Sequence, residues 1–197
     1  MEDKEIKRDQ YKSFYGSSYD RGLDMALEMW RKVKKEVPEA TLEIAYGWDL
    51  FDRFHKDNPG SKMWKAELVK KINEYDGITE YGRLSQPEVV KLMEKCSVWT
   101  FPTYFGEINC ITALKSQALG LEPVVVNYAA LKETVQYGRK VEGDIYDQST
   151  KDEFLKQWID ALKNPMSDEK RQEMMKWANE KYKWSVIAKS WDEEFKL

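Results

Sequence analysis

Residues 101–138 carry the pattern that most limits how this chain can fold. They read FPTYFGEINCITALKSQALGLEPVVVNYAALKETVQYG, and short β-rich runs lie at residues 98–101 and 123–126. Apolar residues between these runs recur at helical spacing, namely at Ile111, Leu114, Ala118 and Leu119. A strand, a helix and a second strand in this order predict a β-α-β unit with parallel strands. In such a unit the turn after the first strand faces a crevice, where the first N–H groups of the helix can bind an anion.

The same alternation of strands and helices continues along the rest of the chain. Further strands are expected at residues 11–15, 41–46, 78–81 and, more weakly, 141–146. Helices are expected at residues 23–37, 64–72, 89–96, 150–162, 167–182 and 184–195, with a short helix in ALKETV and a mobile polar segment at residues 50–60. These elements predict an α/β fold: a Rossmann-like, doubly wound parallel sheet of about six strands, with helices on both faces and extra C-terminal helices.

Size and composition limit the classes of protein to consider. The 197 residues are 42% hydrophobic, which is enough for a full core, and we expect one domain over residues 1–197. A net charge of −3 argues against the broad basic surface that binds nucleic acid. No apolar run approaches the roughly 20 residues of a membrane span, and the charged start MEDKEIKRDQ is unlike a signal peptide. Cys96 and Cys110 lack metal-ligand or disulfide-framework spacing, so a cytoplasmic protein without a metal site is expected.

Four loops should meet at the carboxyl edge of the predicted sheet, at residues 16–22, 47–49, 82–87 and 104–112. The first loop ends in Arg21 and Gly22 at the start of a helix, and the fourth offers Glu107 followed by the backbone amides that open the next helix. A guanidinium group and a helix N-terminus together suit a diphosphate in charge and geometry. A carboxylate suits the hydroxyl groups of a sugar, because it accepts hydrogen bonds but repels phosphate.

Several common catalytic patterns are missing from the sequence. Neither G-x-G-x-x-G nor G-x-x-x-x-G-K-[ST] occurs, so a dinucleotide fingerprint and a P-loop are both excluded. The single histidine, His55, lies in a polar segment, which leaves no credible Ser-His-Asp or Cys-His arrangement. No carboxylate cluster has metal-ligand spacing.

The run EINCITALKSQALGLEPVVVNYAALKETV resembles the donor-binding signature of retaining GT-B glycosyltransferases of family four. That signature is a glutamate, seven residues, a second glutamate, then small residues, a glycine and P-V-V. Its positions are matched here by Glu107, Gly120, Pro123, Val124 and Val125. The segment SSYDRGLDMALEMWRKVKKEVPEATLEIAYG is similar to the opening segment of that family, with Arg21 in the place of a basic residue before glycine. Pro102 and Thr103 lie where the family has a "P-S" strand end.

The resemblance implies a donor site for a nucleotide-diphosphate sugar that needs no metal and no other cofactor. Arg21 would hold the diphosphate and stabilise the charge on it as it leaves, and Glu107 would bind the transferred sugar, so these two residues are assigned the catalytic roles. The other residues expected to bind the donor are Gly16, Ser17, Ser18, Gly22, Gly82, Arg83, Ile108, Asn109, Cys110, Ile111, Thr112 and Lys115. GT-B enzymes pair this domain with an acceptor domain of similar size, which we expect to be missing or separate.

Two departures from the family pattern affect the nucleotide. Lys115 stands at the second glutamate, which in the family accepts hydrogen bonds from ribose hydroxyls, and a cation cannot do so. A further basic residue of the family falls on Gly16 or Ser17, and Arg83 is the residue available to compensate.

Simpler interpretations stay open for single residues and for the whole chain. Arg21 pairs equally well with Asp20 or Asp24, Glu107 also suits a helix start, and Lys115 also suits a solvated helix surface. Glu133, Asn127 and Tyr128 are given no catalytic role. As a whole, the chain is alternatively a non-catalytic interaction module with this fold, or a nucleotide-sugar epimerase, which would require catalytic acids or a histidine in the cleft.

Overall fold

One six-stranded parallel sheet organises the molecule, and its strand order is β3-β2-β1-β4-β5-β6. The structure is a computed structural model that describes residues 7–196. The strands are β1 (Asp9–Tyr15), β2 (Thr41–Ile44), β3 (Ile78–Glu80), β4 (Cys96–Phe101), β5 (Glu122–Val126) and β6 (Arg139–Val141). The order reverses between the neighbouring strands β1 and β4, which creates the crevice typical of a doubly wound sheet.

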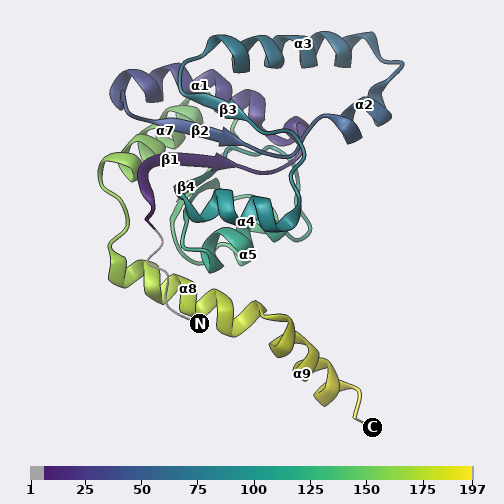
Figure 1. Cartoon of the computed structure of the whole chain (residues 1–197), viewed down its shortest axis with the longest axis vertical. Helices are drawn as coiled ribbons and strands as arrows, with labels where there is room; N and C mark the ends of the chain where they lie inside the picture. The colour runs from purple at the N-terminus through teal and green to yellow at the C-terminus, as the bar shows by residue number, and fades with distance from the viewer. Residues whose placement is uncertain (1–6, 197) are drawn as a thin grey trace.

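Helices cover both faces of the sheet, as Figure 1 shows. Helices α1 and α7 pack on one face and α4 and α5 on the other. Right-handed crossovers that run from β1 toward β3 lie on one face, and those that run in the opposite direction, from β3 to β4 and β5, lie on the other. The helical segments are η1 (Tyr19–Arg21), α1 (Leu23–Glu36), α2 (Asp49–His55), α3 (Pro59–Glu74), α4 (Gln86–Glu94), α5 (Ile111–Ala118), α6 (Leu131–Thr134), α7 (Gln148–Lys163), α8 (Asp168–Tyr182) and α9 (Trp184–Glu194). The predicted Rossmann-like fold is confirmed.

Large aromatic side chains fix α1 and α7 to the sheet. The rings of Trp30 on α1 and Trp158 on α7 lie 5.7 Å apart, and both side chains are fully buried. Each indole N–H finds an acceptor: Trp30 Nε1 donates to the carbonyl of Asp76 at 2.8 Å, and Trp158 Nε1 donates to Ser13 Oγ at 2.9 Å. Because these polar groups are paired, the large rings are buried without leaving an unsatisfied donor.

Two expectations about local structure are wrong. Residues 50–60 are not a mobile segment, because α2 occupies most of them and its Phe51 packs against the rings of Trp48 and Trp64. The last strand covers Arg139–Val141 instead of residues 141–146. Gly143 ends the extended run, since its φ of 112° lies where only glycine is unstrained.

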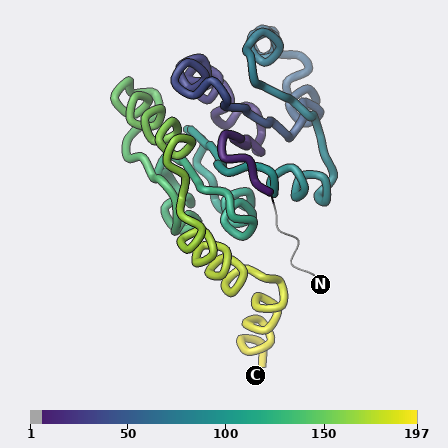
Figure 2. The backbone as a smooth tube through the Cα atoms, turned by 60° about the vertical axis from the view of Figure 1, so that its left-hand side comes forward, coloured from purple at the N-terminus to yellow at the C-terminus, as the bar shows by residue number. Residues whose placement is uncertain are grey.

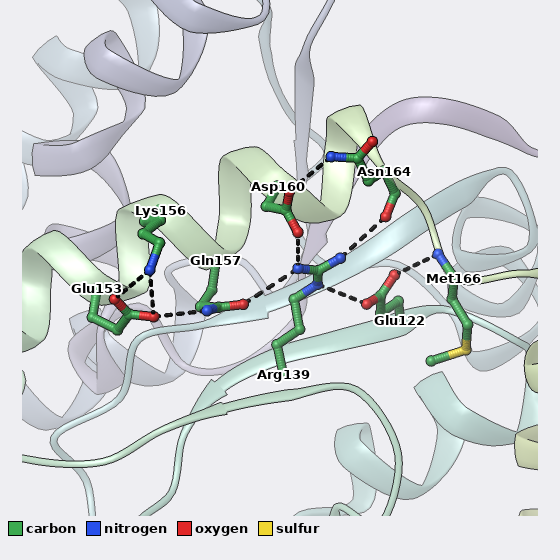
Figure 3. Close-up of polar contacts among 8 residues, drawn as sticks. All are labelled: Glu122, Arg139, Glu153, Lys156, Gln157, Asp160, Asn164 and Met166. Atoms are coloured by element: carbon green, nitrogen blue, oxygen red, sulfur yellow. Dashed lines mark hydrogen bonds and ion pairs between the residues drawn. The ribbon is translucent and has the colours of Figure 1, made fainter.

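An ionic network holds the outer strand β6 to β5 and to the end of α7 (Figure 3). The Arg139 guanidinium donates to Glu122 Oε1 at 2.8 Å and to the carbonyl of Asn164 at 3.1 Å, and it also pairs with Asp160. The second oxygen of Glu122 accepts from the Met166 amide at 2.9 Å. The nearly buried carboxylate of Glu122 is thus fully paired, which is the condition for placing it inside the fold.

The two C-terminal helices differ in how they attach. Ser167 caps α8, as the sequence predicts, by accepting from the Lys170 amide, and Arg171 of α8 donates to the carbonyl of Gly120 beside α5. Helix α9 buries no residue and extends away from the sheet, as the yellow end of the chain in Figure 2 shows. In residues 7–196, no helix is both long enough and apolar enough to cross a membrane.

Candidate functional site

The loops after β1 and β4 lie against each other at the carboxyl edge of the sheet, where the strand order reverses. Gly22 has a φ of 120°, and a Cβ atom at this position would lie 2.5 Å from the carbonyl oxygen of Pro102. Only glycine therefore allows the two loops to approach this closely. A second link joins the same loops further along, where Thr112 Oγ1 donates to the carbonyl of Gly16 at 3.0 Å. The predicted meeting of residue 21 with residues 107–112 is confirmed.

Arg21 and Glu107 form an ion pair across this contact. Arg21 Nη1 lies 3.0 Å from Glu107 Oε1, and the guanidinium carbon lies 4.0 Å above the centre of the Phe105 ring. The Glu107 side chain is only 9% exposed and that of Arg21 is 34% exposed. Arg21 therefore pairs with Glu107 and not with Asp20 or Asp24. Within the described residues the other N–H groups of its guanidinium donate no hydrogen bond, so they can still reach a ligand anion.

The N-terminus of α5 opens at the same contact. Cys110 is the N-cap, and the helix begins at Ile111, so Ile108 and Asn109 lie in the loop before it. Burial raises the pKa of the Cys110 thiol to about 12, although the amides of Ala113 and Thr112 act in the opposite direction. The thiol is therefore neutral at pH 7, and the positive end of the helix is not used by a thiolate.

A cavity of about 260 Å³ lies along α4 and α5, beside the link between Gly16 and Thr112, and neither Arg21 nor Glu107 lines it. Five of the predicted donor-binding residues line it: Gly16, Arg83, Ile111, Thr112 and Lys115. Lys115 Nζ donates to the side-chain oxygen of Gln86, which also lines the cavity. Of the described residues that line it, Arg83 and Lys115 are the charged ones, so the cavity has a positive electrostatic character.

The other predicted donor-binding residues do not line this cavity. They are Ser17, Ser18, Gly22, Gly82, Ile108, Asn109 and Cys110. Ser18 shapes the first loop, because its carbonyl accepts from the Tyr15 hydroxyl at 3.0 Å and from the Arg21 amide at 3.1 Å. Gly82 adopts a φ of 62°, and its carbonyl accepts from the Tyr46 amide at 3.0 Å. These residues build the loops around the site.

Sequence reasoning missed Tyr19, which ties the first loop to the second loop and to the end of β3. Its hydroxyl donates to Glu80 Oε1 at 2.7 Å and accepts from the Gly47 amide at 3.0 Å. Burial is the main cause that raises the pKa of Tyr19, and the hydrogen bond to Glu80 is the second. The hydroxyl therefore stays protonated and able to donate. The motif GSSYDRG places this tyrosine in the first loop but carries no signal for its partners, which lie in the second loop and at the end of β3.

The family model of glycosyl transferases group 1 matches residues 2–182. The chain belongs to this family. Among curated proteins, none has significant sequence similarity to this chain.

Solved structures of glycosyltransferases share the fold of this chain at low sequence identity. The pneumococcal O-GlcNAc transferase GtfA, solved with UDP and GlcNAc, is 14% identical with a TM-score of 0.73, and the match covers 96% of this chain and 36% of GtfA. Sucrose-phosphate synthase from Thermosynechococcus elongatus is 15% identical with a TM-score of 0.73, covering 93% of this chain and 44% of the synthase. S. aureus TarM, solved with UDP, is 14% identical with a TM-score of 0.65, and the match covers 95% of this chain and 36% of TarM. The chain thus spans less than half the length of these relatives.

Proposed function

We propose that this chain binds the nucleotide-diphosphate sugar of a retaining, metal-independent glycosyltransferase. The observation that carries the proposal is the placement of Arg21, 3.0 Å from Glu107, between the loops after β1 and β4 and beside the N-terminus of α5. A guanidinium and the start of a helix lie near each other there, and together they suit a diphosphate in charge and geometry. The nucleoside would occupy the cavity of about 260 Å³ that continues along α4 and α5.

Arg21 and Glu107 would each have a role in transfer of the sugar. When the bond between the anomeric carbon and the diphosphate oxygen breaks, negative charge grows on the departing diphosphate. Arg21 and the first amides of α5 would stabilise that charge from fixed positions, without a metal ion. Glu107 orients Arg21 and would accept hydrogen bonds from hydroxyls of the transferred sugar. In the described residues, no group of three or more His, Cys, Asp and Glu side chains is placed to hold a metal ion.

The acceptor would be bound mainly outside this chain. The solved relatives are more than twice as long as the parts that this chain matches. We propose that an acceptor-binding domain acts beside the sheet edge, either on a separate chain or elsewhere in a longer protein. A cytoplasmic location belongs to the same proposal and is supported by two buried, unpaired cysteines, Cys96 and Cys110.

Titration with a panel of UDP, GDP, ADP and their sugar conjugates tests donor binding. A ligand at 100 times its Kd stabilises the folded state by about 2.7 kcal/mol, which appears as a clear rise in Tm. The rise in Tm should be lost in the variant Arg21→Gln. It should be kept in Arg31→Gln, a matched control on the exposed side of α1. If no member of the panel raises Tm at millimolar concentration, the proposal is contradicted.

A second candidate function is a non-catalytic binding module with the same fold. It is favoured by one observation, which is that Lys115 occupies the position of a hydroxyl-accepting carboxylate and is held by Gln86. The epimerase alternative has no such support. His55 ends α2, where its Nδ1 lies 3.3 Å from Ser61 Oγ, and it lines neither cavity at the carboxyl edge of the sheet.

A further inference from the structure

A second cavity, of about 320 Å³, lies at the same edge of the sheet between the loops that follow β4, β5 and β6. Among the described residues, none lines both this cavity and the one along α4 and α5. Its size is at the lower end of the range for small-molecule sites and suits a ligand as small as a monosaccharide. Donor binding as proposed above does not use this cavity.

Tyrosine rings from all three loops form its apolar surface. The rings of Tyr104 and Tyr146 are stacked with centres 5.2 Å apart and an interplanar angle of 29°. Tyr146 is 58% exposed, and Tyr128 on the loop after β5 is 46% exposed. An exposed ring held in place by a stacked neighbour offers a flat apolar face, which fits the C–H face of a pyranose, and its hydroxyl offers a polar group at the edge.

The polar groups around this cavity are mainly acceptors. Asp144 Oδ1 accepts from the Tyr146 amide at 2.9 Å, which fixes the loop and leaves its other oxygen for a ligand. Tyr104 points its hydroxyl toward Asp24 Oδ2 at 3.5 Å. Asp24 Oδ1 and Asn127 Oδ1 are buried without a hydrogen-bond partner beside lining residues, although neither residue lines the cavity itself. None of the described lining residues is lysine or arginine. Acceptors without cations favour a ligand that donates hydrogen bonds, as hydroxyls do, and disfavour phosphate.

The cavity adjoins the loop that carries Glu107. A Cβ atom at Gly106 would lie 3.9 Å from both the ring and the hydroxyl of Tyr128. The amide of Ala130, two residues after Tyr128, donates to the carbonyl of Glu107 at 3.1 Å. The loops after β4 and β5 are therefore joined by a backbone hydrogen bond, and a ligand on Tyr128 would lie next to the loop that carries the residue assigned to the transferred sugar.

We propose that this cavity, the tyrosine cavity, binds a neutral hexose of the acceptor, so that the donor domain itself holds part of the acceptor. Binding of a neutral sugar follows from the lining residues alone, whereas its assignment to the acceptor rests on the proposed function. The tyrosines would stack on the pyranose ring, and Asp144 would accept from its hydroxyls.

Saturation-transfer NMR with free glucose, galactose, mannose and N-acetylglucosamine at millimolar concentration tests this proposal. At least one sugar should receive saturation from the protein, and a saturating nucleoside diphosphate should leave that signal in place because the two cavities are separate. Tyr146→Ala and Tyr128→Ala should each reduce the signal at least about fivefold, which corresponds to about 1 kcal/mol. Tyr146→Phe keeps the ring and should keep most of the signal.

Phe54→Ala is the matched control, because Phe54 is an exposed aromatic residue on α2, outside the tyrosine cavity. Backbone amide shifts of residues 143–146 in the unaltered protein provide a second measurement that needs no variant. The proposal is overturned if no sugar of the panel receives saturation, or if both alanine variants retain the signal. Arg21→Gln separates the two proposals, since it should abolish binding of the nucleoside diphosphate and leave binding of the free sugar intact.

Discussion

At the level of single residues, the position of the Arg21 guanidinium depends on its ion pair with Glu107. The ion pair holds the guanidinium in one direction, and stacking on Phe105 restricts it further. Part of the positive charge is thereby shared with Glu107, so the diphosphate must compete with, or join, an existing partner. Amides at the start of α5 supply additional donors that are independent of this pair.

Lys115 is the residue whose substitution separates a donor domain from a non-catalytic module. Lys115→Glu should raise affinity for the nucleotide about tenfold or more if the ribose lies in the cavity along α4 and α5, because a hydrogen bond to a charged group contributes about 1.5–3 kcal/mol. Isothermal titration calorimetry measures the change. Lys189→Glu on the exposed surface of α9 makes the same change in net charge and should have no effect. Equal affinity for all three proteins would favour the non-catalytic module.

Asp24 should make stability depend on pH. Burial raises the pKa of Asp24, so the folded state holds the proton more tightly than the unfolded chain. Stability therefore falls as pH rises from the unfolded pKa, near 3.9, through the higher folded pKa. Asp24→Asn, which keeps an acceptor for Tyr104, should have a higher Tm than the unaltered protein at pH 7, and the gap should close toward about pH 4. Asp192→Asn, an exposed carboxylate on α9, should show no such gap.

At the level of elements, the Arg139 network is the main polar attachment of β6. Arg139→Ala should lower the free energy of unfolding by about 2–4 kcal/mol, because it leaves the Glu122 carboxylate buried beside empty space. Urea denaturation measures the loss. Adding Glu122→Gln to this variant should restore part of it, since no uncompensated charge remains. A loss below about 1 kcal/mol would mean that the network has the small effect of a surface ion pair.

Helix α9 should contribute little to the stability of the fold. Ending the chain after Lys183 removes a helix that buries no residue, so Tm should change by no more than about 2–4 °C, the equivalent of 1 kcal/mol at this size. Ending it after Ser167 also removes Arg171, Met174 and Ala178, which are buried, and should lower Tm much further. Differential scanning calorimetry of both truncations distinguishes the two helices. A large fall in Tm for the chain that ends after Lys183 would show that α9 stabilises the domain.

The strength of the periodic signal explains which elements were predictable from sequence. The strong hydrophobic pattern of residues 98–126 predicted the bounds of β4, α5 and β5 to within a few residues. The topology of a parallel sheet then predicted that the loops bearing Arg21 and Glu107 converge. Helix α2 was missed because its one buried residue, Phe51, packs on rings from flanking segments and leaves no periodic stripe. The contact between Arg21 and Glu107 spans 86 positions, and only packing of the loops decides it.

On the scale of the whole molecule, a single sheet edge carries two cavities of different chemistry. The cavity along α4 and α5 is lined by two cations, whereas the tyrosine cavity is lined by aromatic rings and a carboxylate. The loops after β1 and β4 lie between them, with Arg21 and Glu107 in contact. Under the two proposals, this arrangement would place a nucleotide and a neutral sugar in separate cavities beside the loops where transfer would occur.

A crystal structure with the nucleoside diphosphate that raises Tm most tests the central claim directly. We expect the diphosphate within hydrogen-bonding distance of the Arg21 guanidinium and of the first amides of α5, with the nucleoside in the cavity lined by Lys115. A diphosphate bound at a different edge of the sheet, out of reach of Arg21, would contradict the account.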